Sequence, residues 1–69
     1  AMRLNAVAEN PRRSLSSRVA WNLRYQRGPV AVRDVANFLR VRAAAVIVEL
    51  RRLEADGEAR RTEAGWVAT

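Results

Sequence analysis

Arginine carries most of the chemistry that this sequence offers. The 69 residues include 13 basic side chains, all of them arginine, against 7 acidic ones, so the net charge is +6. Arg51 and Arg52 are adjacent, as are Arg60 and Arg61, and Arg42 precedes a run of alanines. A GC-rich genome accounts for the choice of arginine over lysine, but not for the surplus of positive charge. Because a guanidinium group clamps phosphate or bridges two acceptors of a guanine, the pattern favours a polyanionic partner.

Catalysis is not expected from the remaining polar side chains. The chain has no cysteine and no histidine, which excludes disulfides, thiolate or imidazole metal ligands and histidine bases. The hydroxyl groups have no histidine or lysine to activate them, the carboxylates are scattered among arginines, and no glycine-rich phosphate loop is found. We therefore expect a binding protein that is not an enzyme and uses no cofactor or metal.

Length and hydropathy indicate one small domain in the cytoplasm. The 69 residues suffice for one core and are too few for two. No apolar run approaches the roughly 18 residues needed to span a bilayer, and no signal peptide is recognisable, so no membrane partner is expected. We divide the chain into a flexible N-terminal arm, residues 1–13, in which Pro11 prevents a settled helix, and a folded domain, residues 14–69.

Hydrophobic spacing and capping residues predict three helices after the arm. The first spans residues 15–26, with Ser14 as its N-cap. The second spans residues 33–40, and the third spans residues 43–56 and ends at Gly57, a residue typical of the position after a helix. Apolar side chains at helical spacing are expected to build the core: Leu15, Val19, Leu23, Val35, Ala36, Leu39, Val46, Leu50 and Leu53.

Short extended segments complete the predicted fold. Residues 29–32 contain alternating valines and suit a short strand that pairs with a C-terminal hairpin. Residues 58–61 and 66–69 are predicted to form the two strands of that hairpin, with Gly65 near its tip. We expect Trp66 to cover the core, because a domain this small needs large apolar anchors.

The order of these elements resembles the winged helix-turn-helix family. An extended piece, a helix, a tight turn, a longer helix and a hairpin follow one another from Val30 to Thr69. The resemblance implies a fold that is mainly α with a small β-hairpin wing, built on three helices. In the turn, Val41 matches the buried aliphatic residue that the family places there, whereas Arg40 departs from the preference for glycine or a small residue.

The resemblance also implies binding of double-stranded DNA. In this family the start and outer face of the third helix enter the major groove, and arginines of the wing touch phosphate or the minor groove. The corresponding DNA-binding positions in this chain are Arg42, Ala44, Val48, Arg51 and Arg52 on the helix, and Arg60 and Arg61 on the first wing strand. Such a module would serve a small transcriptional regulator, or the DNA-contacting domain of a larger DNA-processing or phage protein.

The outer face of the third helix leaves a second interpretation open. Its first turns offer mainly apolar side chains: Ala43, Ala44, Ala45, Ile47 and Val48. Alanine and valine can touch a thymine methyl group but cannot read a purine edge. Either the protein grips phosphates with little sequence preference, or this face is buried in a homodimer or a protein partner. The alanines also favour helix formation, which is a sufficient reason for their presence.

Two aromatic residues of the first helix raise a related alternative. Trp21 and Tyr25 are one turn apart, on a different side from the core residues. Either they pack under the arm or against the hairpin, or they form an aromatic surface for a dimer or another partner. The second interpretation follows from the rarity of exposed aromatic pairs on monomers.

Overall fold

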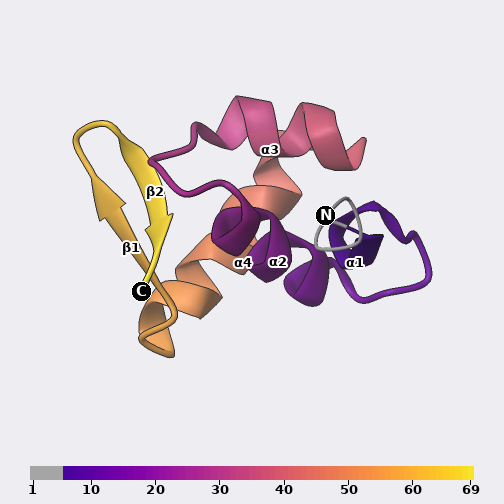
Figure 1. Ribbon diagram of the computed structural model, residues 1–69, viewed down its shortest axis with the longest axis horizontal. Coiled ribbons are helices and arrows are strands. Elements are labelled where there is room, and N and C mark those ends of the chain that lie inside the picture. The colour runs from indigo at the N-terminus through magenta and orange to yellow at the C-terminus, as the bar shows by residue number, and fades with distance from the viewer. Residues whose placement is uncertain (1–5) are drawn as a thin grey trace.

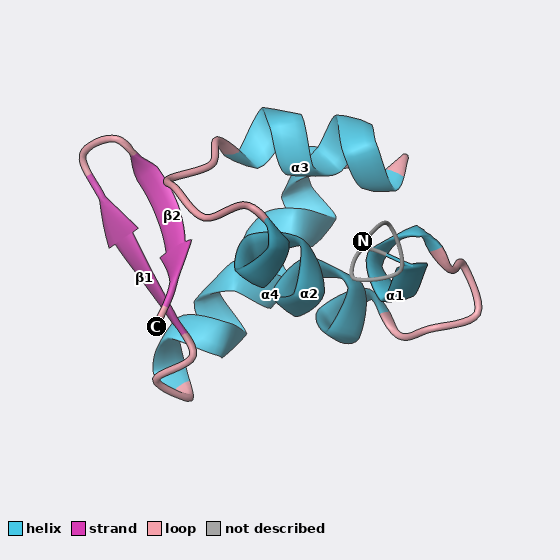
Figure 2. Ribbon diagram, viewed as in Figure 1, coloured by secondary structure: helices cyan, strands magenta, loops and turns pink. Residues whose placement is uncertain are grey.

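Helices make up most of the molecule, and a hairpin lies at one end of it (Figure 1). This computed structural model describes residues 6–69, which form α1 (Ala6–Glu9), α2 (Leu15–Tyr25), α3 (Val32–Leu39), α4 (Ala43–Ala55), β1 (Ala59–Thr62) and β2 (Gly65–Ala68). Figure 2 shows the helices grouped around α2 and α4, and β1 and β2 side by side beyond them. The two strands are antiparallel. The predicted fold class, mainly α with a small β-hairpin wing, is confirmed.

The three predicted helices form close to their expected bounds. Ser14 caps α2, because its Oγ accepts a hydrogen bond from the backbone nitrogen of Ser17 at 3.1 Å. α3 begins at Val32, one residue earlier than predicted, so Val32 belongs to the helix and not to the extended segment. α4 is followed by Gly57, whose φ of 77° is a conformation that favours glycine.

One cluster of buried side chains joins the helices to the hairpin. Its members from α2, α3 and α4 are Val19, Leu23, Val35, Ala36, Leu39, Val46, Leu50 and Leu53. Leu15, the remaining residue predicted for the core, is half-buried at the margin of the cluster. Trp66 from β2 is 7% exposed and packs into the cluster, as expected of a large apolar anchor.

Within residues 6–69, one bridge joins the hairpin to the segment before α3. The Val30 nitrogen donates to the Trp66 oxygen at 2.9 Å, and the Trp66 nitrogen donates to the Val30 oxygen at 2.8 Å. The predicted pairing with the hairpin therefore forms, over one residue. Gly65 makes this approach possible, because a Cβ at that position would lie 2.5 Å from the Val30 oxygen and its φ is 138°.

The segment before α2 is packed over part of its length. The expectation of an arm without a settled helix is wrong for residues 6–9, which form α1, and Ala8 is fully buried. Arg18 supplies the reason: its Nε donates to the Ala8 oxygen at 2.9 Å and its Nη2 to the Leu39 oxygen at 2.9 Å. One guanidinium group thus ties the end of α1 to the end of α3. The remainder of the predicted helix-free arm before α1, residues 1–5, lies outside the described residues.

The turn between α3 and α4 is closed by a residue in the left-handed conformation. Arg40 has φ 60° and ψ 46°. The Val41 nitrogen donates to the Ala36 oxygen at 3.0 Å, which is the long bond of a Schellman-type helix ending. Arginine in place of glycine at this position therefore destabilises the fold, because the left-handed conformation costs a residue with a side chain about 1 kcal/mol.

Candidate nucleic-acid interface

The outward side of α4 carries a stripe of exposed residues. The buried residues of this helix are Val46, Leu50 and Leu53. With 3.6 residues per turn, the opposite side consists of Ala44, Val48, Arg51 and Ala55, all of them exposed. We call these four residues the outer stripe. The sequence predicted the first three as DNA-binding positions. Ala55 was missed because the family's contact positions lie toward the start of the helix, although the same periodicity points to it.

The other apolar residues at the start of α4 do not all share this side. Ala43 is exposed, and Ile47, next to the outer stripe, is 38% exposed. Val48 itself is 57% exposed. Ala45 is half-buried, so its assignment to the outer face is wrong. Its rotation about the helix axis explains this, because it lies on the flank between the outer stripe and the buried side, next to the half-buried Glu49.

Arginines stand at both ends of the apolar part of α4. Arg42 is the N-cap residue and is exposed, and its side chain makes no cap hydrogen bond. Arg51 is exposed and lies three residues beyond Val48. Arg52 is 62% exposed, but its Nη1 lies 3.6 Å from Oε1 of Glu49, whose side chain is only 14% exposed. Arg42 and Arg51 therefore present positive charge to solvent more fully than Arg52 does.

The two hairpin arginines lie on opposite faces of β1. Arg60 is paired with Val67, and Arg61 is paired with Trp66. Since paired residues share a face and successive residues alternate, Arg61 lies on the face that Trp66 turns to the core and Arg60 on the other. Both are exposed. Each face of the hairpin therefore presents one arginine.

Two further arginines are engaged within the protein. Arg18 is half-buried and holds two helix ends, a role that sequence reasoning missed. The guanidinium carbon of Arg24 lies 5.9 Å from the ring centroid of Trp21, and its Nη2 is 3.9 Å from Oε1 of Glu58. Both contacts lie on α2, and the Arg24 side chain remains 56% exposed.

The aromatic pair of α2 does not form one exposed surface. Trp21 is half-buried and packs against the core cluster. Tyr25 is 42% exposed. The interpretation that both residues pack against the domain is therefore correct only for Trp21.

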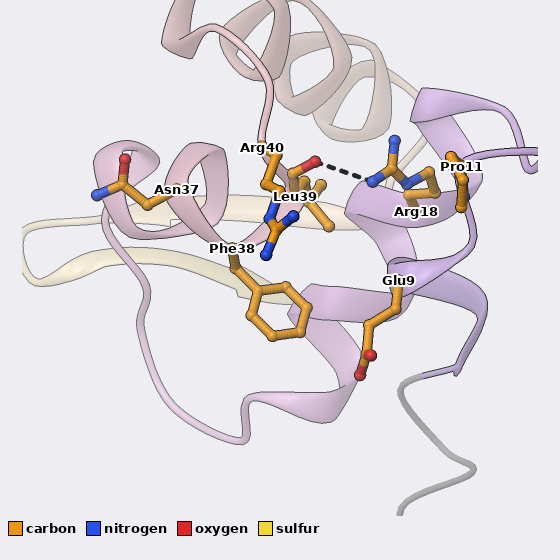
Figure 3. A pocket seen from close by; sticks show the side chains of 7 residues that line it. All are labelled: Glu9, Pro11, Arg18, Asn37, Phe38, Leu39 and Arg40. Carbon is orange, nitrogen blue, oxygen red and sulfur yellow. Dashed lines mark hydrogen bonds between the residues drawn. The ribbon is translucent and has the colours of Figure 1, made fainter.

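An open groove lies between α1 and α3 (Figure 3), and no residue of the outer stripe belongs to its lining. Its volume is about 720 Å³, and it is lined by Glu9, Pro11, Arg18, Asn37, Phe38, Leu39 and Arg40. In the close-up, Phe38 and Glu9 lie on different sides of the same space, and the bond from Arg18 to Leu39 is drawn above them. Among residues 6–69, no group of three or more His, Cys, Asp or Glu is placed to hold a metal ion. The lining shows no arrangement that we can assign to a reaction.

No protein-family model, curated protein sequence or solved structure matches this chain. Within the part that the structure describes, no helix has the length and apolar character needed to cross a membrane. What the protein binds is therefore inferred from the exposed side chains and charges of α4 and the hairpin.

Proposed function

We propose that this protein binds double-stranded DNA, with α4 in the major groove and the hairpin against the sugar–phosphate backbone. The observation that carries the proposal is the exposure of Arg42, immediately before α4, and of Arg51 on the outer stripe, a face of α4 that no other element of residues 6–69 covers. An α-helix about 10–12 Å wide fits a major groove of about 12 Å. The net charge of +6 supports a polyanionic partner.

Phosphate contacts supply most of the affinity in this proposal. Each arginine that neutralises a phosphate releases condensed counterions, so affinity falls as salt rises. Arg42 and Arg51 clamp phosphates or bridge O6 and N7 of a guanine. Arg52 contributes less, because its ion pair with Glu49 must be given up or shared. One of Arg60 and Arg61 reaches the backbone from the hairpin.

The helices and the hairpin also fit the winged helix-turn-helix arrangement that the sequence suggested. α3, the tight turn at Arg40 and α4 follow one another, and the bridge at Val30 attaches the hairpin. Within this proposal the protein is a small transcriptional regulator, or the DNA-contacting domain of a larger DNA-processing or phage protein.

Salt-dependent binding to a labelled random 20-base-pair duplex, followed by fluorescence anisotropy, tests the proposal. With four to six arginines engaged, the logarithm of affinity falls with the logarithm of salt at a slope of about −4 to −5. Arg42→Ala/Arg51→Ala removes two contacts and makes the slope shallower by about 2. The matched control Arg24→Ala/Arg27→Ala removes the same charge on and after α2, which packs on the inner side of α4.

The control is expected to keep the slope of the wild type. An affinity that hardly changes between about 50 and 200 mM salt contradicts the proposal. Equal losses in the two double variants contradict the assignment to α4, because binding would then depend on net charge alone.

A second candidate function is protein–protein interaction through the same face of α4. Its support is the exposure of Val48 at 57% and Ile47 at 38%, high values for aliphatic side chains. It predicts a homodimer or partner complex in sedimentation experiments, which Val48→Glu disrupts. If the protein is monomeric at high concentration, homodimerisation through this face is excluded. Both functions can hold together, because symmetric dimers can bind symmetric duplex sites.

A further inference from the structure

The apolar side chains on the outer side of α4 can make favourable contact with few of the groups in a major groove. Ala43, Ala44, Ile47 and Val48 are exposed, and their side chains have no hydrogen-bond donor or acceptor. A base edge presents amino, carbonyl and ring-nitrogen groups, and a single apolar group, the C5 methyl of thymine. An aliphatic side chain against a polar edge leaves that edge dehydrated and unpaired, whereas against a methyl group both surfaces lose water favourably.

The spacing of the charges sets the length of duplex that α4 covers. Arg42 and Arg51 are nine residues apart, which is about 13 Å along the helix, or about four base pairs. Val48 stands between them, and Arg42 precedes the first turn. In the proposed complex, Val48 therefore faces the groove floor, and the arginines before and after it are in reach of phosphate or guanine.

The charges beside the stripe favour a polyanion over an apolar protein partner. No acidic residue belongs to the outer stripe, and Glu49 is turned inward, with Oε1 buried and Arg52 as its ion-pair partner. Glu54 is exposed, but it lies beyond Arg51 toward the end of the helix. A partner of this face therefore meets aliphatic side chains flanked by arginines.

We infer that α4 reads the C5 methyl group of pyrimidines, with Val48 as the central contact and Ala44 and Ile47 beside it. This inference rests on the proposed DNA binding and adds the chemical feature that the helix recognises. The preferred ligand is duplex DNA with thymines in the major groove at the centre of the site, and 5-methylcytosine satisfies the same contact.

Replacing thymine with uracil isolates the methyl group, because the rest of the major-groove edge is unchanged. Anisotropy titrations compare an A·T-rich 20-base-pair duplex with the same duplex that carries uracil for every thymine. Each buried methyl group contributes about fourfold in affinity, equivalent to about 0.8 kcal/mol. The thymine duplex is thus expected to bind about fourfold or more tightly. The affinity for a G·C-rich duplex is expected to rise by a similar factor when its cytosines carry a 5-methyl group.

Val48→Ser identifies the side chain responsible. Because Val48 is 57% exposed, the substitution leaves the core intact, and the preference for thymine over uracil is expected to fall to less than about twofold. Phe38→Ala is the matched control: this side chain is 41% exposed but belongs to the groove between α1 and α3. It is expected to keep the preference.

The outcomes separate this inference from the proposed function. Salt-sensitive binding with equal affinity for the thymine and uracil duplexes overturns methyl recognition and leaves DNA binding in place. A preference that persists in Val48→Ser also overturns it, because duplex shape would then be the cause. Failure to bind any duplex at low salt overturns both.

Discussion

Arg18 is the side chain whose loss the fold should tolerate least among the arginines of α2. Its Nε and Nη2 donate to Ala8 and Leu39 at 2.9 Å each, over 10 and 21 residues of sequence. Leu39 is the last residue of α3, and Ala8 lies in the last turn of α1, so both carbonyls lack a partner within their own helix. The positive charge also lies at the negative end of the α3 dipole. We predict that Arg18→Met strongly destabilises the protein.

The size of the effect follows from these contacts. A hydrogen bond with a charged donor contributes about 1.5–3 kcal/mol to the free energy of unfolding. Because the site is half-buried, water replaces part of what is lost, so we expect about 2–4 kcal/mol for the two bonds together. A protein of 69 residues has a total stability of about 3–10 kcal/mol. The melting temperature should therefore fall by about 10 °C or more.

Thermal and urea unfolding followed by circular dichroism measure this loss. Arg18→Lys keeps the charge but has one nitrogen in place of the two that reach separate carbonyls. The stability of this variant should therefore lie between that of the wild type and that of Arg18→Met. Arg27→Met is the matched control, an exposed arginine beyond the end of α2, and should change stability by less than about 0.5 kcal/mol. If Arg18→Met unfolds no more easily than this control, the joining of α1 to α3 by Arg18 has no energetic importance.

Three further substitutions test local features of the fold, each by its melting temperature. Gly65→Ala should cost about 2 kcal/mol or more, since its Cβ would meet the Val30 oxygen; a stability equal to wild type would show that the bridge can move aside. Arg40→Gly should raise stability by about 0.5 kcal/mol, because the relief of the left-handed conformation exceeds the entropy cost of glycine; a lower melting temperature would contradict this. Ser14→Ala should cost about 1 kcal/mol by removing the cap on Ser17, and an unchanged value would mean that water replaces the cap.

The helices could be predicted from the sequence because their signals are local. Ser14 and Gly57 mark the ends of two of them, and the spacing of Val46, Leu50 and Leu53 fixes which side of α4 is buried. The outward side follows from the same spacing, so most residues of the candidate interface could be predicted from the sequence alone. The partner of that interface remains a prediction.

The packing of the N-terminal segment was not accessible in this way. α1 has four residues, too few for a periodic pattern. The contacts of Arg18 join positions far apart in sequence, and nothing in its neighbourhood distinguishes it from an arginine at the surface. The division of Trp21 from Tyr25 also depends on tertiary packing, because helical spacing places both on one side.

The hairpin has one unpaired edge, and its two arginines lie on the strand at that edge. β2 is paired with β1 on one side and with Val30 on the other, so β1 is the edge strand among residues 6–69. An edge strand offers unpaired backbone groups to any other chain, which is a route to aggregation. Arg60 and Arg61 are the two middle residues of the four in β1, so two copies meeting at this border would bring four guanidinium groups together. These arginines therefore oppose edge-to-edge association, and replacing both with neutral residues should make the protein less soluble as well as less cationic.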